Sequence, residues 1–153
     1  MDLRVCRQIR VFVSSTFQDM GAERTILVGK VFPMLAEYCR RYRMEFIGVD
    51  LRWGVSEEQS QRGETVSICM SEIEHCRPFF LGILGERYGW VPEGADRSVT
   101  EQEICLGALE APPGTEAFFY LREPALTEDL CGPFVPDPRM AAIQDIFSKF
   151  KEV

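Results

Sequence analysis

Three adjacent hydroxyl residues, Ser14, Ser15 and Thr16, follow the first apolar run of the chain. Hydroxyls at a junction between a strand and a helix can bind a phosphate together with the backbone amides of the helix N-terminus. Alternatively, Ser and Thr at such a place hydrogen-bond local backbone as turn and capping residues. The sequence contains neither a P-loop nor a dinucleotide-binding glycine pattern, so neither nucleotide fingerprint applies.

The loop after the second apolar run carries Asp50, Arg52 and Trp53. Asp50, at the carboxyl end of a strand, can orient a ribose or a base of a partner, and Trp53 can stack on a ring. Alternatively, Asp50 forms an ion pair with Arg52 or Arg87 that fixes the loop, and Trp53 covers it as a hydrophobic lid. Both interpretations stay open, because ion-pair networks also gather in clefts.

The loop after the third run places Glu86, Arg87 and Tyr88 among glycines. Glycine allows backbone to approach a ligand closely, but it is equally common in plain turns. Tyr88 and Trp90 are accordingly either aromatics of a cleft or members of an exposed surface for a partner.

Residues 98–103 (SVTEQE) begin a helix with the pattern of a capping box, in which Ser98 is the N-cap and Glu101 reaches back. Residues two apart on a helix do not share a face, so Glu103 is left to point inward. A carboxylate there can stabilise a developing cation or accept a proton from a ribose hydroxyl. Alternatively, Glu103 is a first-turn acid that complements the helix dipole.

The elements that position these loops are short apolar runs about one strand–helix unit apart, at residues 9–13, 46–49, 79–84 and 117–121. Apolar residues with helical spacing lie between and after them, at 66–73 and 143–150. Pro33 interrupts the first helical stripe, which predicts a kink or two short helices there. Asp137 and Pro138 are typical of a helix start. The order β-α-β-α-β-α-β-α predicts an open, doubly wound parallel sheet, in which ligands bind beyond the carboxyl ends of the strands.

Composition sets limits on function. The chain has 153 residues, 46% of them hydrophobic, and a net charge of −7, which fits one packed domain and excludes intrinsic disorder. The acidic balance argues against a nucleic-acid partner, and the basic cluster of Arg40, Arg41 and Arg43 is typical of a helix C-terminus. No apolar stretch is long enough to span a membrane, and no secretory signal is recognisable.

Cysteine and histidine usage indicates neither a metal site nor a disulfide framework. None of the six cysteines forms a C-x-x-C pair, so we expect reduced thiols and a cytoplasmic setting. His75 is the only histidine and is expected at the surface, and no metal motif is present.

Taken together, the loops resemble the DUF4062 domain found at the N-terminal side of large NACHT-bearing STAND NTPases. That family includes nephrocystin TPR proteins, NACHT–WD-repeat proteins and a telomerase-associated vault protein. The resemblance covers about residues 9–123 and rests on IRVFVSSTFQDM (9–20), ER (23–24), GVDLRWGV (48–55), GILGERYGW (82–90) and SVTEQE (98–103). It implies that residues 1–153 are a single module of a larger protein.

The domain is in turn similar to the TIR-type, flavodoxin-like fold. By that resemblance Glu103 is the candidate catalytic residue of an NAD-cleaving enzyme. Residues expected to line the nucleotide site are Ser14, Ser15, Thr16, Phe17, Asp50, Arg52, Trp53, Glu86, Arg87 and Tyr88. TIR domains carry a fifth strand after the fourth helix, so this chain is expected to lack a final edge strand. A free apolar sheet edge favours association.

Three functions follow from these patterns. The first is a protein-interaction or effector module of a STAND-type signalling protein, which acts through self-association with Tyr88, Trp90 and Phe134 as contact residues. The alternative is an NAD nucleosidase with NAD as substrate. The third is a ribonucleoprotein component, which the resemblance alone implies and the net charge argues against.

Overall fold

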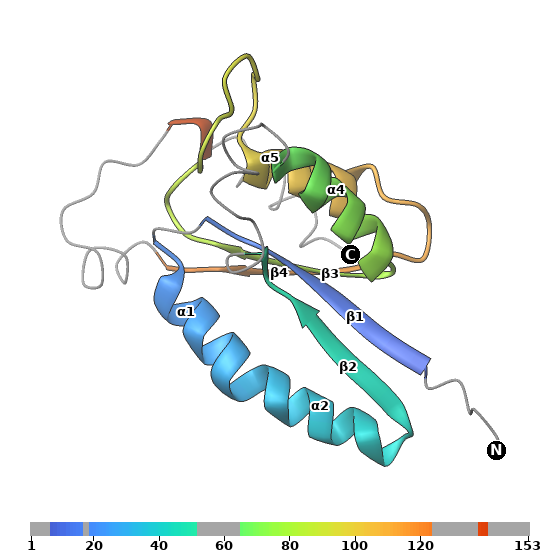
Figure 1. Cartoon of the computed structure of the whole chain (residues 1–153). Coiled ribbons are helices and arrows are strands. Elements are labelled where there is room, and N and C mark those ends of the chain that lie inside the picture. The colour runs from blue at the N-terminus through green and yellow to red at the C-terminus, as the bar shows by residue number, and fades with distance from the viewer. Residues whose placement is uncertain (1–6, 17–18, 52–64, 124–137, 141–153) are drawn as a thin grey trace.

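The computed structural model describes residues 7–16, 19–51, 65–123 and 138–140. Four parallel strands form one sheet in the order β2-β1-β3-β4 (Figure 1). The strands are β1 (Arg7–Ser14), β2 (Met44–Val49), β3 (Phe79–Leu84) and β4 (Glu116–Leu121). All four predicted strands are confirmed, and the open parallel sheet with helices between its strands is the expected α/β fold of flavodoxin and TIR type.

One long helical segment connects β1 to β2. It consists of α1 (Gly21–Ile26), a π-helical turn η1 (Leu27–Val31) and α2 (Phe32–Arg41). The residues at both joins keep right-handed helical angles, so the segment continues without a break. Pro33 lies inside this continuous segment, where it has no N–H to donate to the preceding turn, and the predicted irregularity takes the form of the wider π turn just before it.

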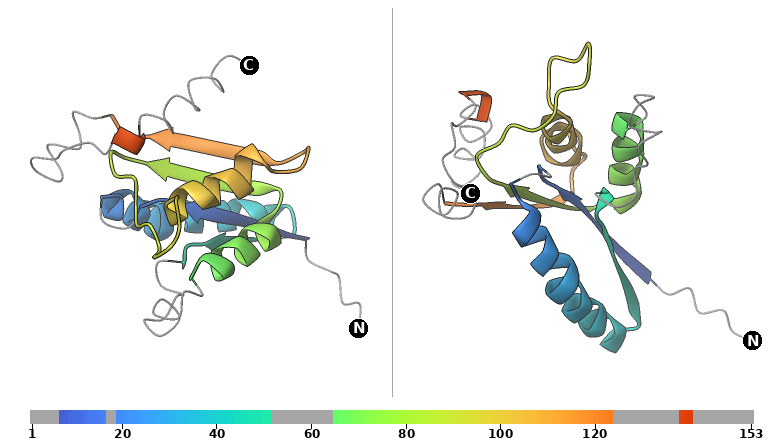
Figure 2. Two further views of the ribbon diagram at one scale, coloured as in Figure 1. Left: turned by 90° about the horizontal axis from the view of Figure 1, so that it is seen from above. Right: turned by 60° about the vertical axis from the view of Figure 1, so that its left-hand side comes forward.

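The remaining helices lie on the other side of the sheet. They are α4 (Thr65–Cys76), α5 (Val99–Ile104) and the π-helical turn η3 (Cys105–Leu109) that continues α5. Figure 2 shows this layer on one side of the strands and the α1–α2 segment on the other. Residues 138–140 are helical, whereas Asp137 and the predicted helix over 143–150 lie outside the described residues.

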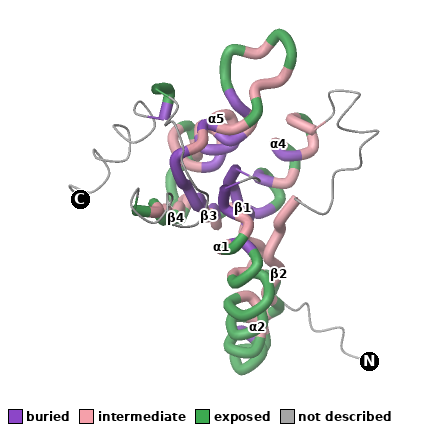
Figure 3. Tube along the Cα trace, turned by 90° about the vertical axis from the view of Figure 1, so that its left-hand side faces the viewer, coloured by how far each residue is buried: buried purple, intermediate pink, exposed green. Residues whose placement is uncertain are grey.

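Two apolar clusters hold these layers together, and Figure 3 shows the buried residues gathered along β1, β3 and α5. The larger cluster packs Phe12 and Phe80 of the sheet against Cys69, Ile73 and Ile104 of the helices. The smaller one joins Val13, Met20 and Ile83 to Leu27 and Phe32 of the α1–α2 segment. Burying side chains of this size contributes about 1.5–3 kcal/mol each.

One surface feature agrees with the expectation from sequence. His75 is exposed on α4, with its ring 3.8 Å from the Glu72 carboxylate. Cys39, Cys69, Cys76 and Cys105 are free thiols. None of the helices that the structure describes combines the length and the apolar character needed to cross a bilayer.

Candidate functional site

The loops singled out by sequence meet at the carboxyl ends of β1 and β3. This region contains a cluster of polar side chains that are almost entirely buried: Ser14, Ser15, Thr16, Asp19, Arg24, Glu86, Ser98, Thr100 and Glu103. Parallel strands end at the same edge of a sheet, so side chains distant in sequence come together here. Buried polar groups of this kind must find partners, and their partners define what the site can do.

Glu103 is a buried residue of α5, five positions after the N-cap Ser98. Its carboxylate accepts a hydrogen bond of 2.5 Å from the Ser14 hydroxyl, which lies at the end of β1. Only 7% of Glu103 is exposed, and burial raises the pKa of its carboxyl group from 4.5 to about 7, although Ser14, Cys69 and Arg24 each oppose the shift. Desolvation favours the neutral acid, so Glu103 changes protonation state near neutral pH.

Cys69 of α4 stands beside this pair. Burial and the neighbouring Glu103 carboxylate raise the pKa of the Cys69 thiol well above its usual range. The thiol therefore stays protonated and inert as a nucleophile, and it acts as a packing residue of the larger cluster.

The start of α5 is capped differently from the predicted box. The Ser98 hydroxyl accepts a hydrogen bond of 3.1 Å from the Glu101 amide, as an N-cap does. The carboxylate of Glu101, however, accepts a hydrogen bond from the Tyr88 hydroxyl, and that hydroxyl in turn accepts one of 3.2 Å from the Ser98 amide. The Tyr88 hydroxyl, from the loop after β3, thus links the Ser98 amide to the Glu101 carboxylate, two groups that the predicted capping box would join directly.

Tyr88 is only 4% exposed, so the prediction that it belongs to an exposed surface for a partner is wrong. Its ring also lies under the Arg139 guanidinium, 4.2 Å from the centroid. Trp90, by contrast, is 55% exposed, as a contact residue would be. Phe134 lies outside the described residues.

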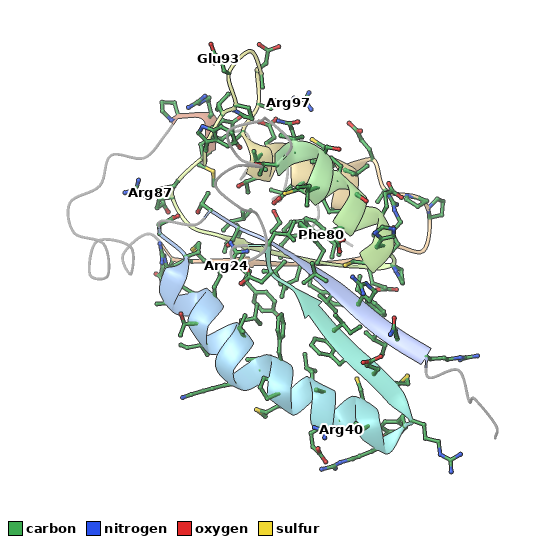
Figure 4. The ribbon with its side chains drawn as sticks, in the orientation of Figure 1. Arg24, Arg40, Phe80, Arg87, Glu93 and Arg97 are labelled. Atoms are coloured by element: carbon green, nitrogen blue, oxygen red, sulfur yellow. The ribbon has the colours of Figure 1, made fainter. Side chains whose placement is uncertain are left out.

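Asp50 is held by Arg24, a residue of α1 that the loop analysis did not consider. The guanidinium donates to both carboxylate oxygens, at 2.6 and 3.2 Å, and to the Ser15 carbonyl at 3.2 Å. Figure 4 shows Arg24 reaching from α1 to the ends of the strands. Asp50 is therefore part of an ion pair, as the second interpretation expected, and Arg24 is a partner that the sequence did not indicate, whereas Arg52 lies outside the described residues.

Arg122 is a second cation that sequence reasoning missed. It follows β4, and its side chain is almost fully buried between the Glu23 carboxylate at 2.8 Å and the Asp19 carbonyl at 2.7 Å. Asp19 also accepts a hydrogen bond from the Thr16 hydroxyl. The available signal was a charged residue directly after an apolar run, at the edge where the other polar loops end.

The close packing of the loops is visible at Gly89, which has a φ of 94°. A Cβ atom there would lie 3.0 Å from the Thr100 hydroxyl and 3.2 Å from the methyl group of Thr16. The loops after β1 and β3 thus touch each other and the first turn of α5.

Not every polar atom of the cluster is satisfied. Glu86 is 7% exposed, and one of its carboxylate oxygens is buried without a hydrogen-bond partner. This oxygen can accept a hydrogen bond from a ligand, whereas Ser14, Thr16 and Asp50 are engaged within the protein. Phe17, Arg52 and Trp53 lie outside the described residues, so their predicted roles stay predictions.

Among the described residues, the arrangement offers the buried carboxyl of Glu103, whose pKa is raised, and a buried carboxylate oxygen without a hydrogen-bond partner on each of Glu86 and Glu23. Within the described ranges, no group of three metal-binding side chains comes together. The other candidate residues mainly fix three loops to one another.

The model of one protein family matches residues 10–110, and the family is described as a domain of unknown function, DUF4062. Telomerase protein component 1 of Mus musculus is 34% identical in an alignment 150 residues long that covers 86% of this chain. NACHT and WD repeat domain-containing protein 2 of Homo sapiens is 39% identical in an alignment of 112 residues that covers 69% of this chain. A TPR repeat-containing protein of Dictyostelium discoideum is 30% identical in an alignment of 151 residues that covers 81% of this chain.

The matched region is a small part of each relative: 6% of the mouse and human proteins and 9% of the Dictyostelium protein. No solved structure matches the chain.

Proposed function

Because the chain belongs to the DUF4062 family and resembles segments of far longer NACHT-, WD-repeat and TPR-repeat proteins, we propose that it is a protein-interaction module that acts through self-association. Repeat arrays of this kind present extended binding surfaces, so such relatives are assembled from interaction modules. The free thiols of the described cysteines support a reducing, cytoplasmic location for it.

The observation that carries the proposal is an apolar flank of the α1–α2 segment that the fold leaves uncovered. We call it the α2 face, and it consists of Val31, Met34, Leu35, Tyr38 and Tyr42, all exposed. Apart from Met34, these residues follow the spacing i, i+4, i+7, i+11, so they lie along one side of a helix. Met34 has the largest exposed fraction of the five, 71%.

The α2 face is distinct from the side of the helix that packs on the sheet. Phe32 and Cys39 point to the sheet, and Phe32 fills the space above Gly48 of β2. Tyr38 and Tyr42 instead lie against each other, with ring centroids 5.2 Å apart and their hydroxyls hydrogen-bonded at 3.3 Å. Single exposed apolar residues are ordinary, but a contiguous patch marks an interaction site.

The test is the mass of the purified chain in sedimentation velocity as its concentration is raised. We expect the wild type to form oligomers and Met34→Glu/Tyr38→Glu to stay monomeric, because two carboxylates would have to be buried unpaired. Ser71→Glu, an exposed charge on α4 in the opposite layer, is the matched control and should assemble like the wild type.

A monomeric wild type at every concentration would contradict self-association. Equal loss of assembly in Ser71→Glu would contradict the α2 face as its site, because added negative charge alone would then explain the effect.

A second candidate function, cleavage of NAD, is favoured by one observation: Glu103 is a buried residue of α5 with a pKa near neutrality, at the edge of the sheet where ligands bind. A carboxylate at this place would stabilise the oxocarbenium-like ribose that forms as the bond to nicotinamide breaks. The hydrogen bond from Ser14 would orient it.

This candidate predicts nicotinamide release from NAD by the purified chain, at high concentration if assembly activates the site. Glu103→Gln keeps the side chain's size and should abolish release while leaving the fold intact. Release that survives in Glu103→Gln would exclude Glu103 as the catalytic residue.

A further inference from the structure

The side of the sheet that carries the α1–α2 segment is only partly covered. Phe119 of β4 packs with Phe80 in the larger core cluster. Successive side chains of a strand alternate between the two faces, so Phe118 and Tyr120 point to the α1–α2 side. The cluster on that side contains residues of β1, β3 and the long helix and none of β4. Phe118 and Tyr120 are accordingly 52% and 65% exposed.

We call this surface the β4 face, defined by Glu116, Phe118 and Tyr120, which share one side of the strand. In register beside them on β3 lie Phe79, Leu81 and Ile83. Figure 2 shows the helical segment along β1 and β2, with β4 at the opposite edge of the sheet. Parallel sheets are normally covered by helices on both faces, so the β4 face has the form of a site for one more helix.

The two uncovered surfaces differ in charge. Lys30 and Arg41 are exposed on the solvent side of the α2 face, and Glu37, the acid between them in the sequence, is paired with Arg40 at 3.1 Å. Figure 4 places Arg40 at the far end of α2, away from the polar cluster. The β4 face is bordered by exposed carboxylates, Glu116 at the start of the strand and Glu123 just beyond its end.

Arg122 does not neutralise the negative charge at the border of the β4 face. Arg122 follows the strand directly, but its side chain is 4% exposed and is turned inward to Asp19 and Glu23. The β4 face therefore presents aromatic side chains between negative charges, and the α2 face presents apolar and aromatic side chains beside positive ones.

From this complementarity we infer that the α2 face of one copy docks on the β4 face of a second copy and supplies a helix that none of the described residues provides there. The inference rests on the self-association proposed above and names its two surfaces. The contact joins unlike surfaces, so each copy brings one donor face and one acceptor face. Opposite charges around an apolar centre fix the register and speed the encounter.

The experiment uses two full-length variants, each with one face disabled. Met34→Glu/Tyr38→Glu removes the α2 face, and Phe118→Glu/Tyr120→Glu removes the β4 face. All four positions are exposed, and circular dichroism with thermal unfolding checks that both variants fold. If a double Glu variant has a lower melting temperature than the wild type, the double Ser variant at the same two positions is used in its place. Ser71→Glu is again the control for added charge.

We expect each variant alone to be monomeric and their equimolar mixture to form a complex, because each still carries the face that the other has lost. Raising the salt concentration should weaken both this complex and the wild-type oligomer, because exposed charges are screened. A mixture that stays monomeric while the wild type assembles would overturn the pairing of unlike faces and leave self-association standing. A wild type that never assembles would overturn self-association itself.

Discussion

The buried carboxyl of Glu103 is the residue on which the two functional interpretations differ most. In a cleft enzyme it would face a substrate, whereas here it lies beneath Ser14 and beside Cys69. Whether it acts on a ligand or only joins β1 to α5, its burial has a thermodynamic consequence that is independent of any activity. A carboxyl group whose pKa is higher in the folded than in the unfolded chain binds its proton more tightly on folding.

The stability of the protein should therefore depend on pH through Glu103. With a pKa of 4.5 in the unfolded chain and about 7 in the folded one, the folded state holds the proton throughout this window. The free energy of unfolding should fall as pH rises from 4.5 to 7, by about 3 kcal/mol. Glu103→Gln, which stays neutral, should lose this dependence and be more stable than the wild type above pH 7.

Urea unfolding at several pH values measures this directly, with Glu110→Gln, at an exposed position just after η3, as the control. Parallel stability profiles for the wild type and Glu103→Gln would contradict a buried, titrating Glu103.

At this scale the sequence allowed the direction of Glu103 to be predicted but not its partner. The spacing to Glu101 left Glu103 as the inward residue, because two residues apart on a helix face different ways. Ser14, however, lies 89 positions away, and no local pattern pairs the two. The pair of Arg24 and Asp50 was missed as well, because sequence patterns normally place charged residues at the surface.

At the scale of elements, the pair of Arg24 and Asp50 joins α1 to the end of β2. Arg24 also donates to the Ser15 carbonyl, so a single side chain fixes the loop after β1 as well. Removal of one member of a buried ion pair leaves the other charge desolvated and unpaired.

We expect Arg24→Met to lower the free energy of unfolding by about 3–5 kcal/mol, because the Asp50 carboxylate then loses the guanidinium that donates to both of its oxygens. Arg24→Met/Asp50→Leu should regain part of this loss, because it leaves no unpaired charge, and denaturant unfolding of the two variants gives the coupling. Arg40→Met, which removes a guanidinium from an exposed pair on the same helical segment, is the control and should change little. A loss no greater than that of Arg40→Met would contradict the structural role of Arg24.

The elements themselves were largely predictable, because buried parallel strands read as short apolar runs. β3 matches its predicted bounds, whereas β1 and β2 begin earlier than predicted. Their extensions pair Arg7 with Met44 and Gln8 with Glu45, outside the stretch of β1 that pairs with β3. Three of these four residues are polar and exposed, so the extensions carry little apolar signal. The sequence also did not predict that the irregularity near Pro33 is a π turn. A proline within a helical stripe indicates only that the regular helix is disturbed there.

At the scale of the whole molecule, the net charge of −7 is not evenly spread. The α2 face is bordered by Lys30 and Arg41, and the β4 face by Glu116 and Glu123. Composition alone could exclude disorder and argue against nucleic acid, but it could not show that cationic and anionic surfaces lie at opposite edges of the sheet. That separation depends on the strand order β2-β1-β3-β4, which places the strand beneath α2 at one edge and β4 at the other.

The central claim, that this domain assembles through its own surfaces, is tested most directly by the mass of the wild-type chain in sedimentation equilibrium, measured over a wide range of concentrations at low and at high salt. We predict a mass that rises above that of the 17.5 kDa monomer as concentration increases and falls back as salt is added. A monomer mass at every concentration in both buffers would contradict it.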